Sequence, residues 1–98
     1  MKEYRNERIA SLITQKLNEI FQREFDFNGA LVTIKNVEID KELKEAKIKI
    51  AVIPSELEIY VFQEINKEKK NLQRKLLRKL FIRSIPNLKF LIEKHLEE

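Results

Sequence analysis

Apolar residues recur every three or four positions through the first quarter of the chain, with polar residues between them. This spacing places the apolar side chains on one stripe of an amphipathic helix. The segment FDFNGA, residues 25–30, ends the predicted helix, because Asn28 followed by Gly29 is a strong turn signal and Gly29 is the only glycine. The predicted stripe comprises Ile9, Leu12, Ile13, Leu17, Ile20, Phe21 and Phe25.

Residues 31–39 and 45–53 instead alternate between apolar and polar side chains, which is typical of strands with one buried face. In the first of these segments the alternation slips by one position near Lys35 and Asn36, which predicts a β-bulge. The polar residues 40–44 form a short connection. The two segments therefore predict an antiparallel hairpin, and its apolar face needs a cover that a helix can supply.

Two further helices are predicted in the second half of the chain. Pro54 ends the second strand, and Ser55 with Glu58 predicts a capping box, in which each residue bonds to the backbone N–H of the other. The apolar pattern lapses over residues 66–70 and ends before Pro86. The predicted buried stripes are Leu57, Val61 and Ile65 in the first of these helices, and Leu72, Leu76, Leu77, Leu80 and Phe81 in the second.

The segment 87–93 fits two patterns. Leu88, Phe90 and Ile92 alternate as in a strand, but Leu88, Leu91, Ile92 and Leu96 have a spacing that also fits a helix. We favour a strand, because a two-stranded ribbon alone is only marginally stable. The predicted fold class is therefore α+β, with a three-stranded sheet covered by helices in the order helix, strand, strand, helix, helix, strand.

The chain is short and its charge is unevenly distributed. Ninety-eight residues predict a single domain over residues 1–98. The net charge is +4, yet residues 67–86 hold eight basic side chains and one acidic one, whereas residues 54–66 hold three acidic side chains and no basic one. A local positive field of this kind attracts polyanions.

The basic residues of the third predicted helix lie on one side of it. At about 100° per residue, its leucines occupy one half of the helix and Arg74, Lys75, Arg78 and Lys79 the other. Arg74 and Arg78 are four residues apart, as are Lys75 and Lys79, and like charges at this separation on a helix repel each other. A purely structural surface would therefore mix positive and negative side chains. In addition, arginine binds phosphate in a bidentate manner. Nucleic acid is the favoured partner, while an anionic membrane surface, an acidic protein and a merely solvated face remain open. Lys67, Lys69, Lys70 and Arg83 extend the charge at both ends.

The composition argues against several kinds of site. The absence of cysteine excludes disulfides and thiolate chemistry and favours the cytosol, and we find neither a signal-peptide pattern nor an apolar run long enough to cross a bilayer. His95, the only histidine, lies near a terminus, so we expect no catalytic or metal site and no cofactor. Tyr60 and Phe62 could stack on single-stranded bases, although core packing is the stronger expectation for phenylalanine.

Three segments resemble the ribosome-binding factor A family of bacterial small-subunit maturation factors. The strand–turn–strand segment is VTIKNVEIDKELKEAKIKIAV, the third helix and last strand are LQRKLLRKLFIRSIPNLKFLIEK, and the first helix is RNERIASLITQKLNEIF. The resemblance covers roughly residues 4–94 and depends on the order and spacing of these segments. Arg5 and Arg8 match two positions that are usually basic in the family.

The resemblance implies a type II KH-like fold without the usual Gly-x-x-Gly loop. It also implies binding to the small (30S) ribosomal subunit and its 16S rRNA, help with late maturation and 5′-end processing, including during cold adaptation, and no chemistry of its own. Family members typically carry an alanine-x-glycine kink between the second and third helices, where this chain has Glu68, Lys69 and Lys70.

We therefore expect a cytoplasmic, monomeric RNA-binding protein. The alternative is a protein-interaction module whose basic helix binds an acidic partner. A DNA-binding helix-turn-helix fits the predicted hairpin poorly. The candidate RNA-binding residues are Arg74, Lys75, Arg78, Lys79, Lys67, Lys70, Arg83, Arg5 and Arg8.

Overall fold

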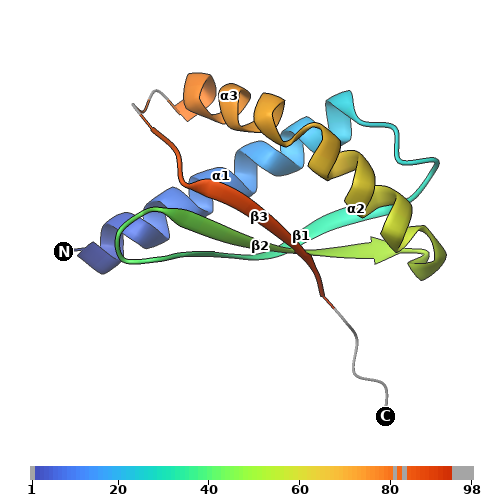
Figure 1. Cartoon of the computed structure of the whole chain (residues 1–98), viewed down its shortest axis with the longest axis horizontal. Coiled ribbons are helices and arrows are strands. Elements are labelled where there is room, and N and C mark those ends of the chain that lie inside the picture. The colour runs from blue at the N-terminus through green and yellow to red at the C-terminus, as the bar shows by residue number, and fades with distance from the viewer. Residues whose placement is uncertain (1, 81, 83, 94–98) are drawn as a thin grey trace, which may run out of the picture.

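The computed structural model describes residues 2–80, 82 and 84–93, with side chains from residue 6 onward (Figure 1). Within these residues the elements follow the predicted order, and the α+β prediction is confirmed. The elements are α1 (Lys2–Glu24), β1 (Leu31–Ile39), β2 (Glu45–Ile53), the short 3-10 helix η1 (Ser55–Leu57), α2 (Glu58–Lys67), α3 (Lys69–Leu80) and β3 (Asn87–Ile92).

The sheet has the strand order β1-β2-β3, with β2 in the centre. β1 runs antiparallel to β2, as the hairpin prediction required, and β3 runs parallel to β2. Ile34 pairs with Ile50 and Asn36 pairs with Lys49, so Lys35 is the extra residue of a bulge. The predicted bulge and the strand predicted at residues 87–93 are both confirmed.

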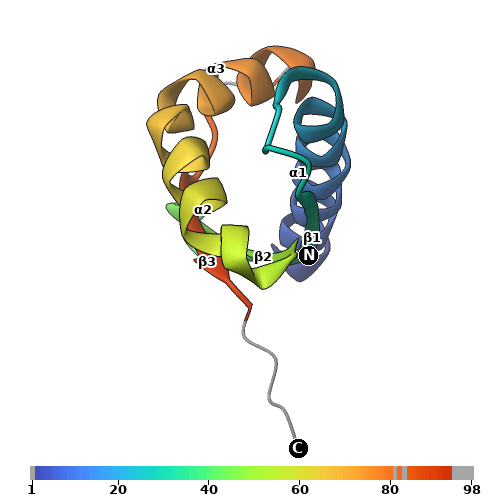
Figure 2. The ribbon, with the colours of Figure 1, turned by 90° about the vertical axis from the view of Figure 1, so that its right-hand side faces the viewer.

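The helices cover one face of the sheet and leave the other face open (Figure 2). The alternation along β2 decides which side chains are covered, because Ile48 and Ile50 are buried while Lys47 and Lys49 are exposed. Burial of one aliphatic side chain of this size stabilises the fold by about 1.5–3 kcal/mol. The core comprises Ile13, Leu17, Ile20, Phe21, Phe27, Ile34, Ala46, Ile48, Ile50, Val52, Val61, Ile65, Leu72, Leu76, Leu88 and Phe90.

Aromatic packing and a left-handed turn fix the end of α1. The Phe21 ring packs edge-on against Phe25 at 5.4 Å and against Phe27 at 5.7 Å between ring centroids. Asn28 and Gly29 then adopt φ angles of 57° and 85°, which glycine and asparagine tolerate better than other residues. The predicted turn is therefore confirmed, and it holds the last turn of α1 in a defined position.

The start of α2 differs from the prediction. Ser55 makes no side-chain capping bond, and α2 begins only at Glu58. After Pro54 the chain first forms the 3-10 turn η1, in which the Leu57 N–H donates to the Pro54 carbonyl at 3.0 Å. A capping box needs the acidic residue at the third position of the helix, and η1 leaves Glu58 at the first position. The predicted capping box is therefore wrong.

A single residue, Glu68, separates α2 from α3 (Figure 1). Its N–H donates to the Ile65 carbonyl at 3.1 Å, and its carbonyl accepts from the Leu72 N–H at 2.8 Å. Its backbone has φ −98° and ψ 12°, which an L-residue can adopt without the conformational freedom of glycine. The chain therefore bends between the two helices although it has no glycine there.

Candidate nucleic-acid interface

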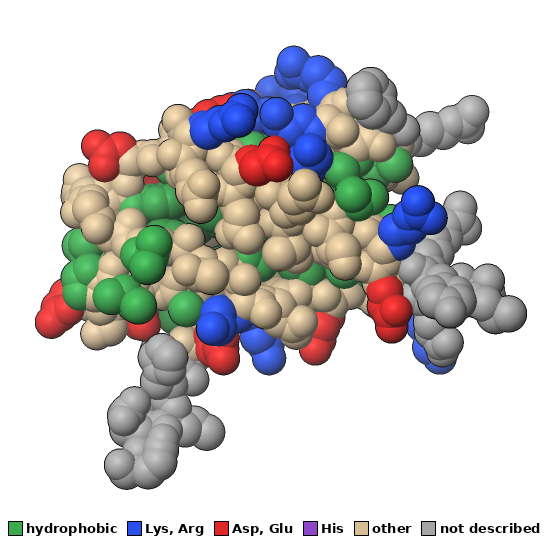
Figure 3. Space-filling view, turned by 180° about the vertical axis from the view of Figure 1, so that it is seen from behind, with side chains coloured by type: hydrophobic (Ala, Val, Ile, Leu, Met, Phe, Trp, Pro, Cys, Tyr) green, Lys and Arg blue, Asp and Glu red, His purple; other side chains and the backbone are tan. Residues whose placement is uncertain are grey.

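α3 presents leucines to the core and cations to solvent. Leu72 and Leu76 are buried and Leu77 and Leu80 are half-buried, which confirms the predicted leucine face for the described residues. Lysine and arginine side chains gather over the top of the molecule, where α3 lies (Figure 3). Arg74, Arg78 and Lys79 are exposed and Lys75 is half-buried.

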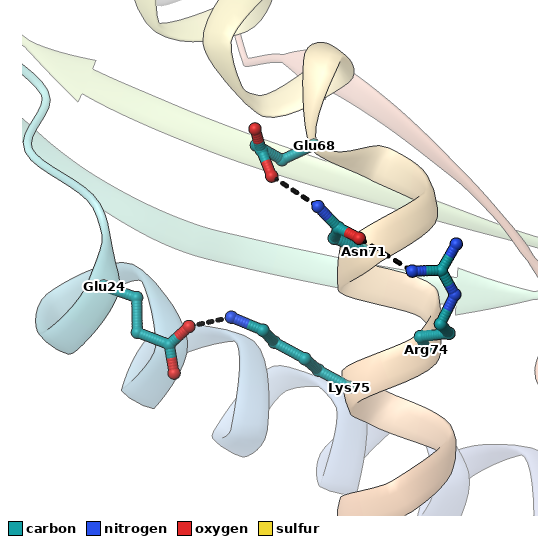
Figure 4. Close-up of polar contacts among 5 residues, drawn as sticks. All are labelled: Glu24, Glu68, Asn71, Arg74 and Lys75. Carbon is teal, nitrogen blue, oxygen red and sulfur yellow. Dashed lines mark hydrogen bonds and ion pairs between the residues drawn. The ribbon is translucent and has the colours of Figure 1, made fainter.

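Lys75 joins α3 to the end of α1. Its Nζ donates to the Glu24 carboxylate in an ion pair between the two helices (Figure 4). The hydrogen bond from Lys75, together with the nearby charges of Lys75, Lys79 and Arg23, lowers the pKa of Glu24 from its ordinary value of 4.5. Both side chains are more than a third exposed, so the pair adds little to stability. Its main consequence is geometric, because it places one carboxylate among the cations.

Arg74 is oriented by a chain of side-chain hydrogen bonds along α3. Its Nη1 donates to Asn71 Oδ1 at 2.9 Å, and Asn71 Nδ2 donates to Glu68 Oε1 at 2.9 Å (Figure 4). Glu68 is the only acidic residue of the segment 67–86, and its hydrogen-bond connection to Arg74 runs through Asn71. A guanidinium has five N–H donors, so this chain positions Arg74 and leaves donors for an external acceptor.

The fold also brings Arg23 into this region, and the sequence pattern did not reveal it. Arg23 lies in the last turn of α1 and contributes to the positive field around Glu24. A basic residue in a last turn is common, because it complements the helix dipole, so the sequence offered no reason to group Arg23 with α3. We call the set of Arg23, Arg74, Lys75, Arg78 and Lys79 the cationic surface.

The remaining described candidate residues lie on α1, α2 and the first turn of α3. Lys67 pairs with Glu64 on α2 at 3.1 Å, and Lys70 is exposed in the first turn of α3. Arg8 is exposed on α1, but at about 1.5 Å per residue it lies about 24 Å along the helix axis from Glu24. Arg83 and the Arg5 side chain lie outside the described residues.

The chemistry available here is electrostatic recognition. A surface of guanidinium and ammonium groups binds phosphate oxygens through charge-assisted hydrogen bonds. In the described part of the chain, no group of three His, Cys, Asp or Glu residues could hold a metal ion. Likewise, none of its helices is long and apolar enough to cross a membrane.

The family model of ribosome-binding factor A matches residues 5–98. The chain belongs to this family. One relative is the ribosome-binding factor A of Chlorobium phaeobacteroides, which is 35% identical over 89 residues that cover 88% of this chain and 77% of the relative. The segments that resembled the family in sequence lie within the matched range, so that expectation is confirmed.

Solved structures of the family share the fold. The crystal structure of ribosome-binding factor A from Thermus thermophilus superimposes with a TM-score of 0.67 at 15% identity, covering 94% of both chains. A Thermus thermophilus model fitted into a cryo-EM map of a 30S–RbfA complex gives a TM-score of 0.73 at 21% identity, covering 84% of this chain and 88% of that one. The α-β-β-α-α-β arrangement is thus the KH-like fold that the resemblance implied.

Proposed function

We propose that this chain binds the small (30S) ribosomal subunit through contacts between its cationic surface and 16S rRNA phosphates. In this proposal it acts in the cytoplasm as a monomeric assembly factor, without chemistry of its own. It assists late maturation of the subunit, including processing of the 5′ end and growth in the cold. Family membership supports ribosome binding, as does the fold shared with a Thermus protein that was fitted into a 30S complex.

The observation that carries the proposal is the separation of leucines and cations on α3. The leucines that anchor the helix are buried, so the cations can contact RNA without loss of core packing. Within the described residues, only Lys75 of the four predicted α3 cations forms an ion pair with the protein's own carboxylates. Arg74, Arg78 and Lys79 therefore have N–H donors to offer phosphates.

A charge-reversal pair of variants tests this surface. In the first variant, Arg74, Arg78 and Lys79 are all changed to Glu. Lys75 stays unchanged, because a carboxylate there would face Glu24. The control variant changes Lys35, Lys49 and Lys89 to Glu, which alters the net charge equally at exposed positions of the sheet.

The measurement is co-sedimentation with mature and precursor small subunits across a salt series. We expect the α3 variant to bind at least about a hundredfold more weakly at low salt and to show a shallower salt dependence. The control should lose much less, and both variants should keep the circular-dichroism spectrum of the parent. Equal losses in the two variants would show that only net charge matters. Unchanged sedimentation of the α3 variant would place the interface elsewhere.

The protein-interaction alternative makes a different prediction for the same variants. An acidic protein partner, rather than rRNA, should then be lost from the α3 variant, while binding to naked precursor 16S rRNA should be weak in every case. Tight, salt-dependent binding of naked rRNA to the parent protein therefore favours the proposal.

A further inference from the structure

Arg74 differs from the other α3 members of the cationic surface because it is oriented without an ion pair. Its Nη1 donates to Asn71 Oδ1 at 2.9 Å (Figure 4). Lys75 is also held, but by the carboxylate of Glu24, which offsets its charge. Within the described residues, the other two α3 cations of the surface make neither a side-chain hydrogen bond nor an ion pair. Arg74 therefore combines a fixed position with a positive charge that pairs with no carboxylate of the described residues.

Asn71 is held in one orientation by its two neighbours. Its Nδ2 donates to Glu68 Oε1 at 2.9 Å, while its Oδ1 accepts from Arg74. A carboxylate can only accept and a guanidinium can only donate, so turning the amide over would break both bonds. The three residues are spaced three apart, which places their side chains next to one another along a helix. They therefore form a relay that is anchored where α2 meets α3.

The relay leaves one fork of the guanidinium available. An arginine side chain has five N–H donors, and Asn71 accepts from one of them, at Nη1. The other two nitrogens, Nε and Nη2, lie on the side away from Asn71 (Figure 4). Their N–H groups form a planar fork that fits two oxygens of one phosphate. Because the Arg74 side chain is exposed, a phosphate can reach this fork.

Asn71 also separates Arg74 from the single carboxylate of the segment 67–86. Glu68 and Arg74 are six residues apart, or about 9 Å along the helix axis, and the neutral amide lies between them. A direct carboxylate partner would offset the positive charge, as Glu24 does for Lys75. The relay therefore fixes the guanidinium without neutralising it.

We propose that Arg74 is the anchor of the cationic surface, which binds one backbone phosphate of the rRNA through Nε and Nη2, and that Asn71 is its positioning residue. This inference rests on the proposed function. A mobile arginine loses rotamer freedom when it binds, whereas a side chain that is already held loses less. The same phosphate contact is therefore stronger at Arg74 than at Arg78, although both side chains carry the same charge.

Charge-conserving variants of the full chain test the anchor. Arg74→Lys and Arg78→Lys each keep the positive charge and remove the fork. In filter binding with precursor 16S rRNA, we expect affinity to fall about tenfold for Arg74→Lys and about twofold for Arg78→Lys. The slope of log affinity against log salt should match that of the parent in both variants, because the number of cations that release counterions is unchanged. Equal losses would overturn the anchor.

A double-mutant cycle tests the role of Asn71. Asn71→Ala should weaken rRNA binding about fivefold in the parent, and it should have no further effect in an Arg74→Ala background, because its contribution acts through Arg74. Asn66→Ala is the matched control. Asn66 is an exposed asparagine of α2 whose Nδ2 donates to the Phe62 carbonyl at 2.9 Å, and its replacement should leave rRNA affinity unchanged. Urea denaturation checks that each variant keeps the parent fold.

Each outcome decides the proposal. A larger loss for Arg74→Lys than for Arg78→Lys, together with an Asn71→Ala effect that vanishes without Arg74, supports it. An Asn71→Ala effect of the same size in both backgrounds, or none in the parent, overturns the positioning role. If the triple charge-reversal variant of α3 loses rRNA binding while Arg74→Lys does not, the proposed function stands and the anchor is wrong. If the triple variant binds rRNA normally, the proposed function fails and the anchor fails with it.

Discussion

α3 and the groove between α2 and β3 use amphipathic structure in opposite ways. On α3 the apolar side is consumed by the core, and the exposed side is cationic. The groove is lined by residues 58, 59, 62 and 63 of α2 and by residues 90–92 of β3. In the groove Ile59 is 73% exposed, and the segment 54–66 beside it carries three glutamates and no lysine or arginine. The two regions meet at Glu68, the residue at which the chain bends between α2 and α3. Adjacent helices therefore present surfaces of different chemistry.

The difference indicates how much each region can contribute to rRNA binding. The cationic surface offers charge without an apolar pocket, so the RNA binding that we propose for it depends on phosphates and on salt. Among the described residues, no lysine or arginine lines the groove, so we expect the groove to contribute little to rRNA affinity. The following predictions separate their contributions, beginning with the largest expected effect.

The largest difference should appear in stability. Leu76 is fully buried on α3, so Leu76→Ala removes core packing and should lower the free energy of unfolding by about 2–5 kcal/mol. Ile59 is 73% exposed, so Ile59→Ala should change it by no more than about 0.5 kcal/mol. Urea denaturation of both variants measures the contrast. Similar losses would mean that Ile59 supports the fold.

The next effect concerns rRNA affinity in the two regions. Arg78→Glu removes one exposed cation of α3 and should weaken rRNA binding by about tenfold at low salt, while Ile59→Ala in the groove should change it less than about twofold. Lys49→Glu on the sheet makes the same charge change as Arg78→Glu and serves as the control. Filter binding provides the readout. If Ile59→Ala weakened rRNA binding as much as Arg78→Glu, the groove would be part of the rRNA interface.

A smaller effect should follow from the carboxylate within the cationic surface. Glu24→Gln releases Lys75 from its ion pair and removes one negative charge beside Lys79 and Arg23. We expect rRNA affinity to rise by about two- to threefold at low salt, with a steeper salt dependence. Glu42→Gln, in the exposed turn between β1 and β2, removes the same charge elsewhere. An equal gain in that control would contradict a local role for Glu24.

The smallest effect is on the pH dependence of stability. The pKa of Glu24 is lowered in the folded protein by the hydrogen bond from Lys75 and the nearby cations. A lowered pKa contributes stability above the ordinary value of 4.5, and this contribution is lost as the pH falls through the folded-state pKa. The difference in urea midpoint between the parent and Glu24→Gln should therefore shrink as the pH falls below 4.5. A difference that grows with acidification would contradict this assignment.

The sequence by itself determined the elements of this protein and the two sides of α3. Periods of two and of three to four residues are local consequences of strand and helix geometry, so the strands, the bulge at Lys35 and the leucine and cation faces were all predictable. The family was also recognisable from the order and spacing of segments. The start of α2 was not predictable. The chain forms a 3-10 turn after Pro54, so α2 begins at Glu58, and residue preferences do not reveal this turn.

Only the tertiary structure decided which distant groups lie together. It placed β3 parallel to β2 at the edge of the sheet, which brought Phe90 and Ile92 beside Ile59 in one groove. It also brought Arg23 and Glu24 from the end of α1 to Lys75 on α3. These contacts between distant segments depend on how the helices pack on the sheet and on each other. The periodicity of a single segment contains no information about its neighbours in space.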